Sequence, residues 1–454
     1  MKNLITVLTL ASLVFFSLIG CQKDDQAPPE VEEPVAREYS NKVVLQGLSV
    51  STDNSAKLTW SKLDTSAFRE YLILRKENKE DIIDISHPFY YPSQIIKRIS
   101  DPNTTSFTDV ELPYTPYLEY QVIAVLGTSN SISKNLYSNS KTYERPDIKV
   151  FKAQPYDVLP DLSNNRLYII ESDSGKISIY NFENGALEKS ISTNAKIGFS
   201  DFGTFNGKRE LYVPRNDGWV YVYDAATLQK TDQVNCGSDA SCVVFNNNKL
   251  FVSTDDDYWP NRPVKVIDRA TKAVIATAGD NDRTRIKLIP GTTSEFIDIS
   301  LYVGPTDLGY LKFDANGNKV IQFEDRYHGD YPLDAMAFQI MPNGLEFITS
   351  DEGAIYSKDL TYKLRLPHGN YRYSDFAFSS TGSIIYAACR NNKLVISYTS
   401  PGYVETKKYS TKGYPYKIFR KDNTLICLSS SSPLGSYSPY NFSSAKLFIE
   451  KIAL

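Results

Sequence analysis

The sequence predicts an all-β protein, a β-sandwich followed by a seven-bladed β-propeller. Tyr (32) and Phe (22) dominate an apolar content of 41%, while Met (3) is scarce, a composition that favours strands over helices. Residues 146–454 also repeat a similar pattern about every 43 residues, and a period of about 40–45 residues with four strands is typical of propeller blades.

The N-terminus predicts export. Residues 1–20 carry a short apolar run from Leu4 to Ile19 and end in Leu-Ile-Gly before Cys21. This pattern resembles a bacterial lipoprotein signal peptide, and the resemblance implies that Cys21 carries fatty-acyl chains such as palmitate and becomes the mature N-terminus. The alternative is an uncleaved anchor helix. The run is at the short end of the ~17–25 residues that a spanning helix needs, and acidic Asp24 and Asp25 follow it.

The residues after Cys21 predict where the chain is held. Lys23-Asp24-Asp25 resembles the surface-export signal of lipoproteins from Bacteroidota. That resemblance implies an anchor in the outer leaflet of the outer membrane, facing the extracellular medium. Two or more acyl chains anchor stably, at ~0.8 kcal/mol per buried methylene. Residues 21–41 are rich in Pro and Glu, which predicts a flexible tether.

Residues 42–145 predict the sandwich. Strand patterns include Ala56 to Trp60 and Tyr71 to Arg75. Trp60, Phe107-Thr-Asp109, Leu112-Pro113 and the Tyr-x-Val-x-Ala-Val pattern beginning at Tyr120 resemble a fibronectin type III domain. The resemblance implies a spacer module.

This module departs from the family pattern at two places. The corner tyrosine is replaced by Leu118, with Tyr117 one residue early. Residues 78–100 form a long connection that contains His87. Ligand binding on that connection, near Phe89, is the functional alternative to a spacer.

Residues 146–454 predict the propeller. Its seven similar segments begin at Tyr156, Phe199, Ala240, Arg285, Leu333, Tyr373 and Tyr414. The last segment has patterns for three strands, and Asp147 to Phe151 is expected to add the fourth, which would close the ring. Asp217-Gly-Trp-Val-Tyr-Val-Tyr-Asp resembles quinoprotein-like and YVTN-type repeats. The main alternative, two stacked sandwiches, leaves the regular spacing unexplained.

Composition and motifs narrow the function classes. A formal net charge of −3 gives no basic face for nucleic acid. The chain lacks a nucleophile-elbow, phosphate-loop or His-Glu-x-x-His motif, and three His with five Cys leave little for zinc. His328 and His368 lie in Gly- and Pro-containing connections. Either could act as a general base, but a loop histidine with only local contacts is the favoured interpretation.

Cys236 and Cys242 could form a disulfide across a Gly-Ser-Asp-Ala-Ser turn, because an exported protein meets oxidising conditions. The alternative is two small buried residues. Cys389 and Cys427 lie in apolar strand patterns and are predicted to be core residues.

Aspartates recur at one point of the repeat. Asp157, Asp201 and Asp375 precede an aliphatic-Tyr pair by the same interval, and Asp334 and Asp239 hold nearly equivalent places. This is where the innermost strand begins, so the pattern predicts carboxylates around one mouth of the central channel. Such a ring would attract a cation or a hydroxyl-rich ligand. The alternative is that each aspartate caps a local turn.

Aromatic residues suggest a ligand class. Trp219 and Trp259 offer flat faces, and Trp259 follows the acidic run Asp255-Asp256-Asp257. Rings beside carboxylates suit sugars, although the same aromatics could pack between blades. The acidic run could also bind a calcium ion, with a solvated loop as the alternative.

These observations predict a non-enzymatic binding or scaffold protein of the cell surface, with glycan or protein ligands on a propeller face and no cofactor. Asp157, Asp201, Asp334 and Asp375 are the candidate ligand-binding carboxylates. One alternative is an extracellular polysaccharide lyase or hydrolase, which needs His, Tyr, Arg and a carboxylate in one cleft. Another is a structural component of a surface complex.

Overall fold

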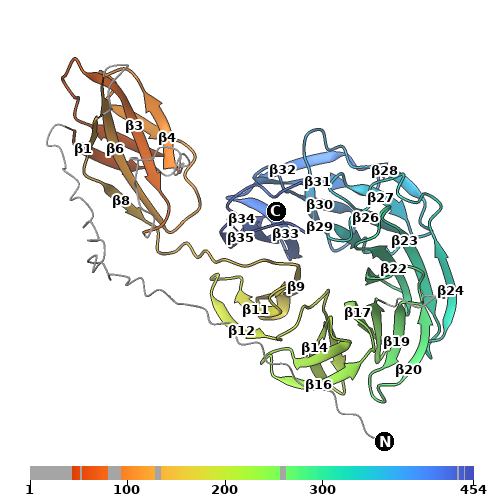
Figure 1. The fold of residues 1–454 in the computed structure, drawn as a ribbon. Helices are drawn as coiled ribbons and strands as arrows, with labels where there is room; N and C mark the ends of the chain where they lie inside the picture. Colours follow the sequence, from red (N-terminus) through yellow and green to blue (C-terminus); the bar gives the residue numbers. More distant parts are fainter. Residues whose placement is uncertain are drawn as a thin grey trace, which may run out of the picture.

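The computed structural model describes residues 43–51, 54–79, 94–127, 134–255, 262–436, 439–443 and 445–454. These residues are almost entirely strands and their connections, as the sequence predicts (Figure 1). Within them, none of the segments forms a helix long and apolar enough to span a bilayer. Cys21, the tether, His87, Trp259 and the last two residues of the Asp255-Asp256-Asp257 run lie outside the described residues.

The N-terminal unit consists of two antiparallel sheets around one core. Their strand orders are β1-β2-β5 and β4-β3-β6-β7, with β8 also paired to β6. The strands are β1 (Leu45–Val50), β2 (Ala56–Trp60), β3 (Phe68–Lys76), β4 (Ile95–Ile99), β5 (Ser106–Asp109), β6 (Tyr117–Leu126), β7 (Lys134–Tyr137) and β8 (Lys141–Glu144). Trp60 packs edge-on against Tyr71 across the sheets, with ring centroids 5.6 Å apart. Leu118 is buried in this core, while the Tyr117 hydroxyl bonds the Glu119 carboxylate.

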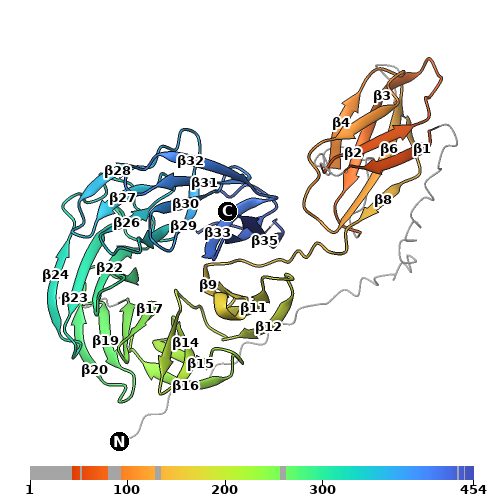
Figure 2. The same cartoon turned by 180° about the vertical axis from the view of Figure 1, so that it is seen from behind.

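Seven sheets arranged radially follow, and Figures 1 and 2 show them around a common axis. In the described residues six of these blades have four strands and the seventh has three. The propeller that the sequence predicts is therefore confirmed.

Blades are numbered in chain order, and the first strand of each is innermost. Blade 1 contains β9 (Asp157–Asp161), β10 (Arg166–Glu171), β11 (Lys176–Asn181) and β12 (Leu187–Ser192), with the short 3-10 turn η2 (Leu162–Asn164). Blade 2 contains β13 (Asp201–Phe205), β14 (Lys208–Pro214), β15 (Trp219–Asp224) and β16 (Lys230–Asn235). Blade 3 contains β17 (Ala240–Asn246), β18 (Lys249–Thr254), β19 (Val264–Asp268) and β20 (Val274–Ala278). Blade 4 contains β21 (Thr284–Leu288), β22 (Glu295–Ser300), β23 (Leu308–Phe313) and β24 (Lys319–Glu324).

The last three blades complete the ring. Blade 5 contains β25 (Phe338–Ile340), β26 (Glu346–Thr349), β27 (Ala354–Ser357) and β28 (Tyr362–Arg365). Blade 6 contains β29 (Tyr373–Phe378), β30 (Ile384–Cys389), β31 (Leu394–Thr399) and β32 (Glu405–Ser410). Blade 7 contains β33 (Tyr414–Lys421), β34 (Thr424–Ser430) and β35 (Leu447–Ala453).

Burial explains the strand patterns. The second strand of a blade is covered by neighbouring blades on both faces, so β10 is buried over nearly its whole length, whereas the outermost β12 is mostly exposed. The interface of blades 3 and 4 is aromatic: the Phe251 ring lies 4.4 Å from that of Phe296 and 5.0 Å from that of Phe313. Full burial of one such ring contributes about 1.5–3 kcal/mol.

Ring closure differs from the sequence expectation. Asp147 to Phe151 does not add a full fourth strand to blade 7. Phe151 forms one antiparallel bridge with Leu447, in which each backbone N–H donates to the other carbonyl at 2.8 Å. The N–H of Ile148 bonds Arg145 in a turn instead, so the turn keeps this part of the chain away from β35.

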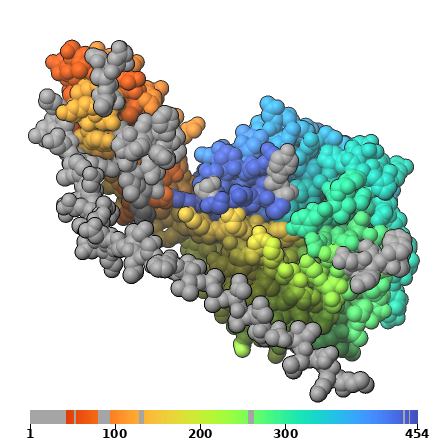
Figure 3. Space-filling model, viewed as in Figure 1, coloured from red at the N-terminus to blue at the C-terminus, as the bar shows by residue number. Residues whose placement is uncertain are grey.

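Side-chain packing closes the ring. One core cluster joins Leu167, Tyr180 and Phe182 of blade 1 to Tyr416 and Leu447 of blade 7. Figure 3 shows the yellow and blue surfaces of these two blades in direct contact. Closure therefore depends on apolar burial more than on strand pairing.

We expect Leu447→Ala to lower the free energy of unfolding by about 2–5 kcal/mol, because Leu447 is fully buried between the first and last blades. Val404→Ala is the matched control, since Val404 is 61% exposed, and we expect a change within about 0.5 kcal/mol. Urea denaturation of the purified full-length chain measures both. Equal effects of the two substitutions would contradict closure by packing.

Candidate functional site

Three adjoining cavities lie on one face of the propeller and share one residue, Tyr156. Their volumes are about 310, 320 and 410 Å³. Tyr302 lines the first and second cavities, and Tyr440 lines the first and third. Tyr156 precedes the innermost strand of blade 1, and Tyr302 follows the second strand of blade 4. Because strands in a blade alternate in direction, both positions fall at the same end of the ring.

Hydroxyl and charged groups surround these aromatic rings. The first cavity is lined by Ser300, Thr306, Asp334, Asp351 and Ser436, and the second by Asp173, Lys196, Asn216, Asp239 and Arg283. The Tyr156 and Tyr302 hydroxyl oxygens are 3.4 Å apart. Burial raises the pKa of Tyr156 well above its ordinary value, so its hydroxyl keeps its proton at neutral pH. The three cavities, called the Tyr156 depression below, thus combine aromatic faces with donors and acceptors.

The predicted aspartates divide into two groups. Asp334 lines the first cavity and Asp239 lines the second. Asp157, Asp201 and Asp375 line none of the three cavities. Asp334 also accepts a hydrogen bond from the backbone N–H of Met336 at 2.8 Å, as the turn-capping alternative expects.

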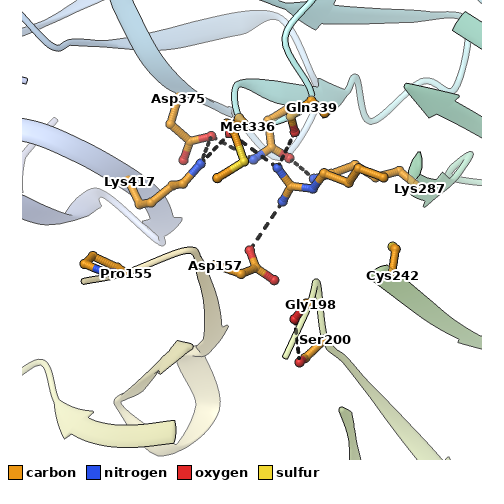
Figure 4. Close-up of polar contacts among 12 residues, drawn as sticks. Pro155, Asp157, Gly198, Ser200, Cys242, Lys287, Met336, Gln339, Asp375 and Lys417 are labelled. Atoms are coloured by element: carbon orange, nitrogen blue, oxygen red, sulfur yellow. Dashed lines mark hydrogen bonds and ion pairs between the residues drawn. The ribbon is translucent and has the colours of Figure 1, made fainter. Parts of the chain in front are cut away.

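Asp157 and Asp375 belong to a polar network inside the ring, which Figure 4 shows. Asp157 of blade 1 lies 3.4 Å from the guanidinium of Arg285 on blade 4. Arg285 also donates to the carbonyl of Ala335 at 2.7 Å and to that of Met336 at 3.3 Å. A single buried cation thus joins blade 1, blade 4 and the segment that leads into blade 5.

Asp375 anchors the opposite side of this network. Its carboxylate accepts hydrogen bonds from Gln339 Nε2 at 2.9 Å and from the backbone N–H of Ile418 at 3.0 Å, and Lys417 Nζ lies 3.9 Å away. Lys417 Nζ donates to the Met336 carbonyl at 2.7 Å. Lys287 Nζ reaches Gln339 Oε1 at 2.7 Å. We call Asp157, Arg285, Lys287, Gln339, Asp375 and Lys417 the hub network.

Two groups in and beside the hub network have strongly shifted pKa values. Burial lowers the pKa of Lys287 to about 7, and neighbouring Arg285 adds to that shift. Desolvation raises the pKa of Asp201 to about 7, although its oxygens accept hydrogen bonds from the backbone N–H groups of Phe202 at 2.8 Å and Phe245 at 2.9 Å.

The aromatic predictions have different outcomes. Trp219 begins β15, the third strand of blade 2, at the same end of the ring but farther from its axis, and it lines none of the three cavities. Trp259 lies outside the described residues. Tyr302 and Tyr440 were not predicted as candidates from the sequence. A usable signal was present, because each is a tyrosine in a connection rich in Gly, Ser or Pro.

The disulfide expectation is corrected. Cys236 and Cys242 are both free and buried. Cys236 packs in the apolar cluster between blades 2 and 3, whereas Cys242 packs in a different cluster with Phe251 and Phe296. The two thiols therefore belong to separate cores. Burial raises the pKa of Cys236 to about 11 and that of Cys242 to about 12.

The two described histidines lie apart from each other and line none of the three cavities. His368 Nδ1 is 2.9 Å from Arg372 Nη1, and Arg372 Nε is 3.7 Å from Asp351. His328 lies beside Asp307, with 3.5 Å between Nδ1 and the carboxylate. Only the His368 array borders the Tyr156 depression, through Asp351.

Asp255 is the described residue of the acidic run. Its carboxylate bonds Arg283, which also reaches Asp239 at 3.3 Å. The calcium site proposed for this run remains a prediction.

Comparison with solved structures finds neighbours of low sequence identity. No family model matches the chain, and no curated protein matches it. Hydrazine synthase of Kuenenia stuttgartiensis is 14% identical with a TM-score of 0.49, and the match covers 66% of this chain and 96% of that one. The WD40 repeats of RRP9 are 13% identical with a TM-score of 0.49, and the match covers 67% of this chain and 97% of that one.

We expect Arg285→Met to lower the free energy of unfolding by about 3–5 kcal/mol, because it leaves Asp157 buried without its cation. The matched control is Lys408→Met, which removes an exposed ion pair with Glu405 at 3.2 Å and should cost less than about 1 kcal/mol. Chemical denaturation at pH 7 measures both. If Arg285→Met lowers the free energy of unfolding by less than about 1 kcal/mol, the ion pair between Asp157 and Arg285 is dispensable for stability.

Asp201 should make stability fall as pH rises. Its pKa is about 7 in the folded chain and ~3.9 when unfolded, so between those values the folded state binds more protons and is favoured at the acidic end. Asp201→Asn removes this titration while losing one accepted hydrogen bond. The free energy of unfolding of the wild type minus that of Asp201→Asn should therefore decrease from pH 4 to pH 7. A constant difference across that range would contradict the assignment.

Proposed function

We propose that this chain is a lipid-anchored cell-surface protein that binds glycans in the Tyr156 depression. The observation that carries the proposal is the lining of three adjoining cavities by Tyr156, Tyr302 and Tyr440 together with carboxylates and hydroxyls. Aromatic rings bury the apolar faces of sugar rings, and carboxylates accept their hydroxyl hydrogens.

The size and exposure of the depression suit this ligand class. Each cavity falls within the range of roughly 300–1,000 Å³ that small-molecule sites occupy. Tyr302 is 62% exposed, so its ring is available for stacking. Three linked cavities favour an oligosaccharide over a single sugar.

The N-terminal region supports presentation at a surface. A lipidated Cys21, a tether over residues 21–41 and a fibronectin type III-like unit would hold the propeller away from the membrane. The two sheets sharing one core, with orders β1-β2-β5 and β4-β3-β6-β7, agree with that family assignment.

We expect the fibronectin type III-like unit to hold a fixed position against the propeller. The Tyr114 ring lies 4.4 Å from that of Phe448 on β35. Lys446 Nζ donates to the Glu77 carbonyl at 3.1 Å and lies 3.2 Å from Thr115 Oγ1. These contacts join the N-terminal unit to blade 7.

A polysaccharide-acting enzyme remains the second candidate. The observation that favours it is the array of His368, Arg372 and Asp351 at the border of the first cavity. If the chain is such a lyase or hydrolase, the His368→Ala variant should lose turnover while it still binds the substrate. Release of unsaturated or reducing ends from a bound polysaccharide would select this candidate.

We expect the purified full-length chain to bind a defined subset of a glycan array, and Tyr302→Ala to weaken that binding at least tenfold. Tyr302→Phe keeps the ring and should retain most of the affinity. Trp219→Ala should leave binding unchanged, because Trp219 lines none of the cavities.

Leu345→Ala is the control for the opposite face. Leu345 is 63% exposed in the connection between the first two strands of blade 5, at the other end of the ring from Tyr302. Binding to no glycan would overturn the proposal. Equal loss in Leu345→Ala and Tyr302→Ala would place the ligand elsewhere.

A further inference from the structure

Three potential metal ligands meet beside blade 4. Asp307 immediately precedes β23, and Asp325 immediately follows β24. The backbone N–H of Asp325 donates to the Leu308 carbonyl at 2.9 Å, so pairing of these two strands brings the aspartates together. The chain then turns and returns His328 to the same place. One oxygen of each carboxylate and one ring nitrogen of His328 all lie within 4.8 Å of one another.

Unsatisfied oxygens distinguish this group from an ordinary acidic surface. Asp325 is only 7% exposed, and its Oδ1 is buried with no hydrogen-bond partner among the described residues. The Oδ1 of Asp307 is likewise buried without a hydrogen bond among the described residues, and His328 Nδ1 lies 3.5 Å from it. Buried polar atoms normally have a partner, and a bound cation would satisfy two unpartnered carboxylate oxygens in one cluster of ligands.

Backbone groups hold the cluster from outside. The backbone N–H groups of Tyr327 and His328 face the Asp325 carboxylate, and the backbone N–H of Asp307 donates to Ser300 Oγ at 2.8 Å. These contacts fix both aspartates in place. The side chain of His328 is 66% exposed, so one side of the group is open to an entering ion and to water.

We propose that Asp307, Asp325 and His328 bind a divalent transition-metal ion, of which Zn²⁺ is the expected occupant. Two carboxylates and one imidazole give an N,O set with room for a water ligand, as in three-ligand zinc sites. The imidazole disfavours Ca²⁺ and Mg²⁺, which take oxygen ligands. The ligand atoms lie within 4.8 Å of one another, and small side-chain rotations bring them to the roughly 3.4 Å separation of a tetrahedral zinc shell.

The bound ion would join two connections of blade 4. Asp307 ends the connection of residues 301–307, which carries Tyr302 and Thr306 into the Tyr156 depression. Asp325 and His328 belong to the connection after β24. The ion therefore ties the wall of the depression to the outer strand of the blade. The metal site itself does not depend on the proposed glycan binding.

The test uses the untagged full-length chain, stripped with a chelator, and the metal ion alone. We expect isothermal titration to show one equivalent of Zn²⁺ bound, and Asp325→Asn and His328→Ala each to raise the Kd at least tenfold. Co²⁺ bound at the site should show the visible absorption of an N,O ligand set without thiolate charge transfer.

Matched controls separate this site from adventitious binding. His368→Ala removes the other described histidine, and Asp314→Asn alters a half-buried turn aspartate at the far end of β23. Both should bind Zn²⁺ like the wild type. Asp325→Asn removes a buried carboxylate charge in the metal-free chain, so this variant should still fold. Asp307→Asn provides a second carboxylate variant.

Absence of Zn²⁺ binding would overturn the proposal. Binding that survives Asp325→Asn and His328→Ala would do the same, as would tighter binding of Ca²⁺ that is insensitive to His328→Ala. A loss in His368→Ala equal to that in His328→Ala would also overturn it.

Discussion

The ion pair between Asp157 and Arg285 is the interaction on which the candidate site depends. It joins the first blade to the fourth, and the same guanidinium holds the carbonyls of Ala335 and Met336. Tyr156 precedes Asp157 directly, and Asp334 precedes Ala335. One buried cation therefore sets the separation between two walls of the Tyr156 depression.

The hub network contributes alignment more than stability. Removing charges from water costs several kcal/mol per ion, and the attraction between buried partners offsets this only when their remaining atoms are also hydrogen-bonded. Arg285 and Lys417 meet that condition by donating to backbone carbonyls as well as facing carboxylates. Aliphatic side chains in place of both partners of a pair would pack the ring equally well, whereas removal of one partner alone leaves an uncompensated buried charge. The aromatic interfaces, such as Phe251 with Phe296, supply the stability.

Much of the fold could be predicted from the sequence, because blade positions follow a local strand-and-turn period. The starts at Tyr156, Phe199 and Tyr373 lie within two residues of the innermost strands. The repeat also located the aspartates at those strands. It could not show that Asp157 and Asp375 face cations, because Arg285 and Lys417 come from distant blades. The strand pairing that closes the ring was overestimated from the sequence. A turn at Arg145, which the residue pattern does not reveal, leaves Phe151 with a single bridge.

The candidate site was harder to predict than the fold. Tyr302 and Tyr440 come from irregular connections, where no period relates them to the ring, and their meeting beside Tyr156 is a product of closure. Trp219 looked more prominent in sequence because it occupies a regular strand. The cluster of Asp307, Asp325 and His328 likewise depends on the pairing of β23 with β24 and on a turn, neither of which composition reveals.

Hydrogen–deuterium exchange tests the central role of the hub most directly. Comparison of Arg285→Met with the wild type should show faster amide exchange at two segments far apart in sequence, residues 153–161 of blade 1 and residues 333–340 leading into blade 5. Little change is expected at the outer strand β12. Faster exchange confined to β21, where the substitution lies, would contradict the account.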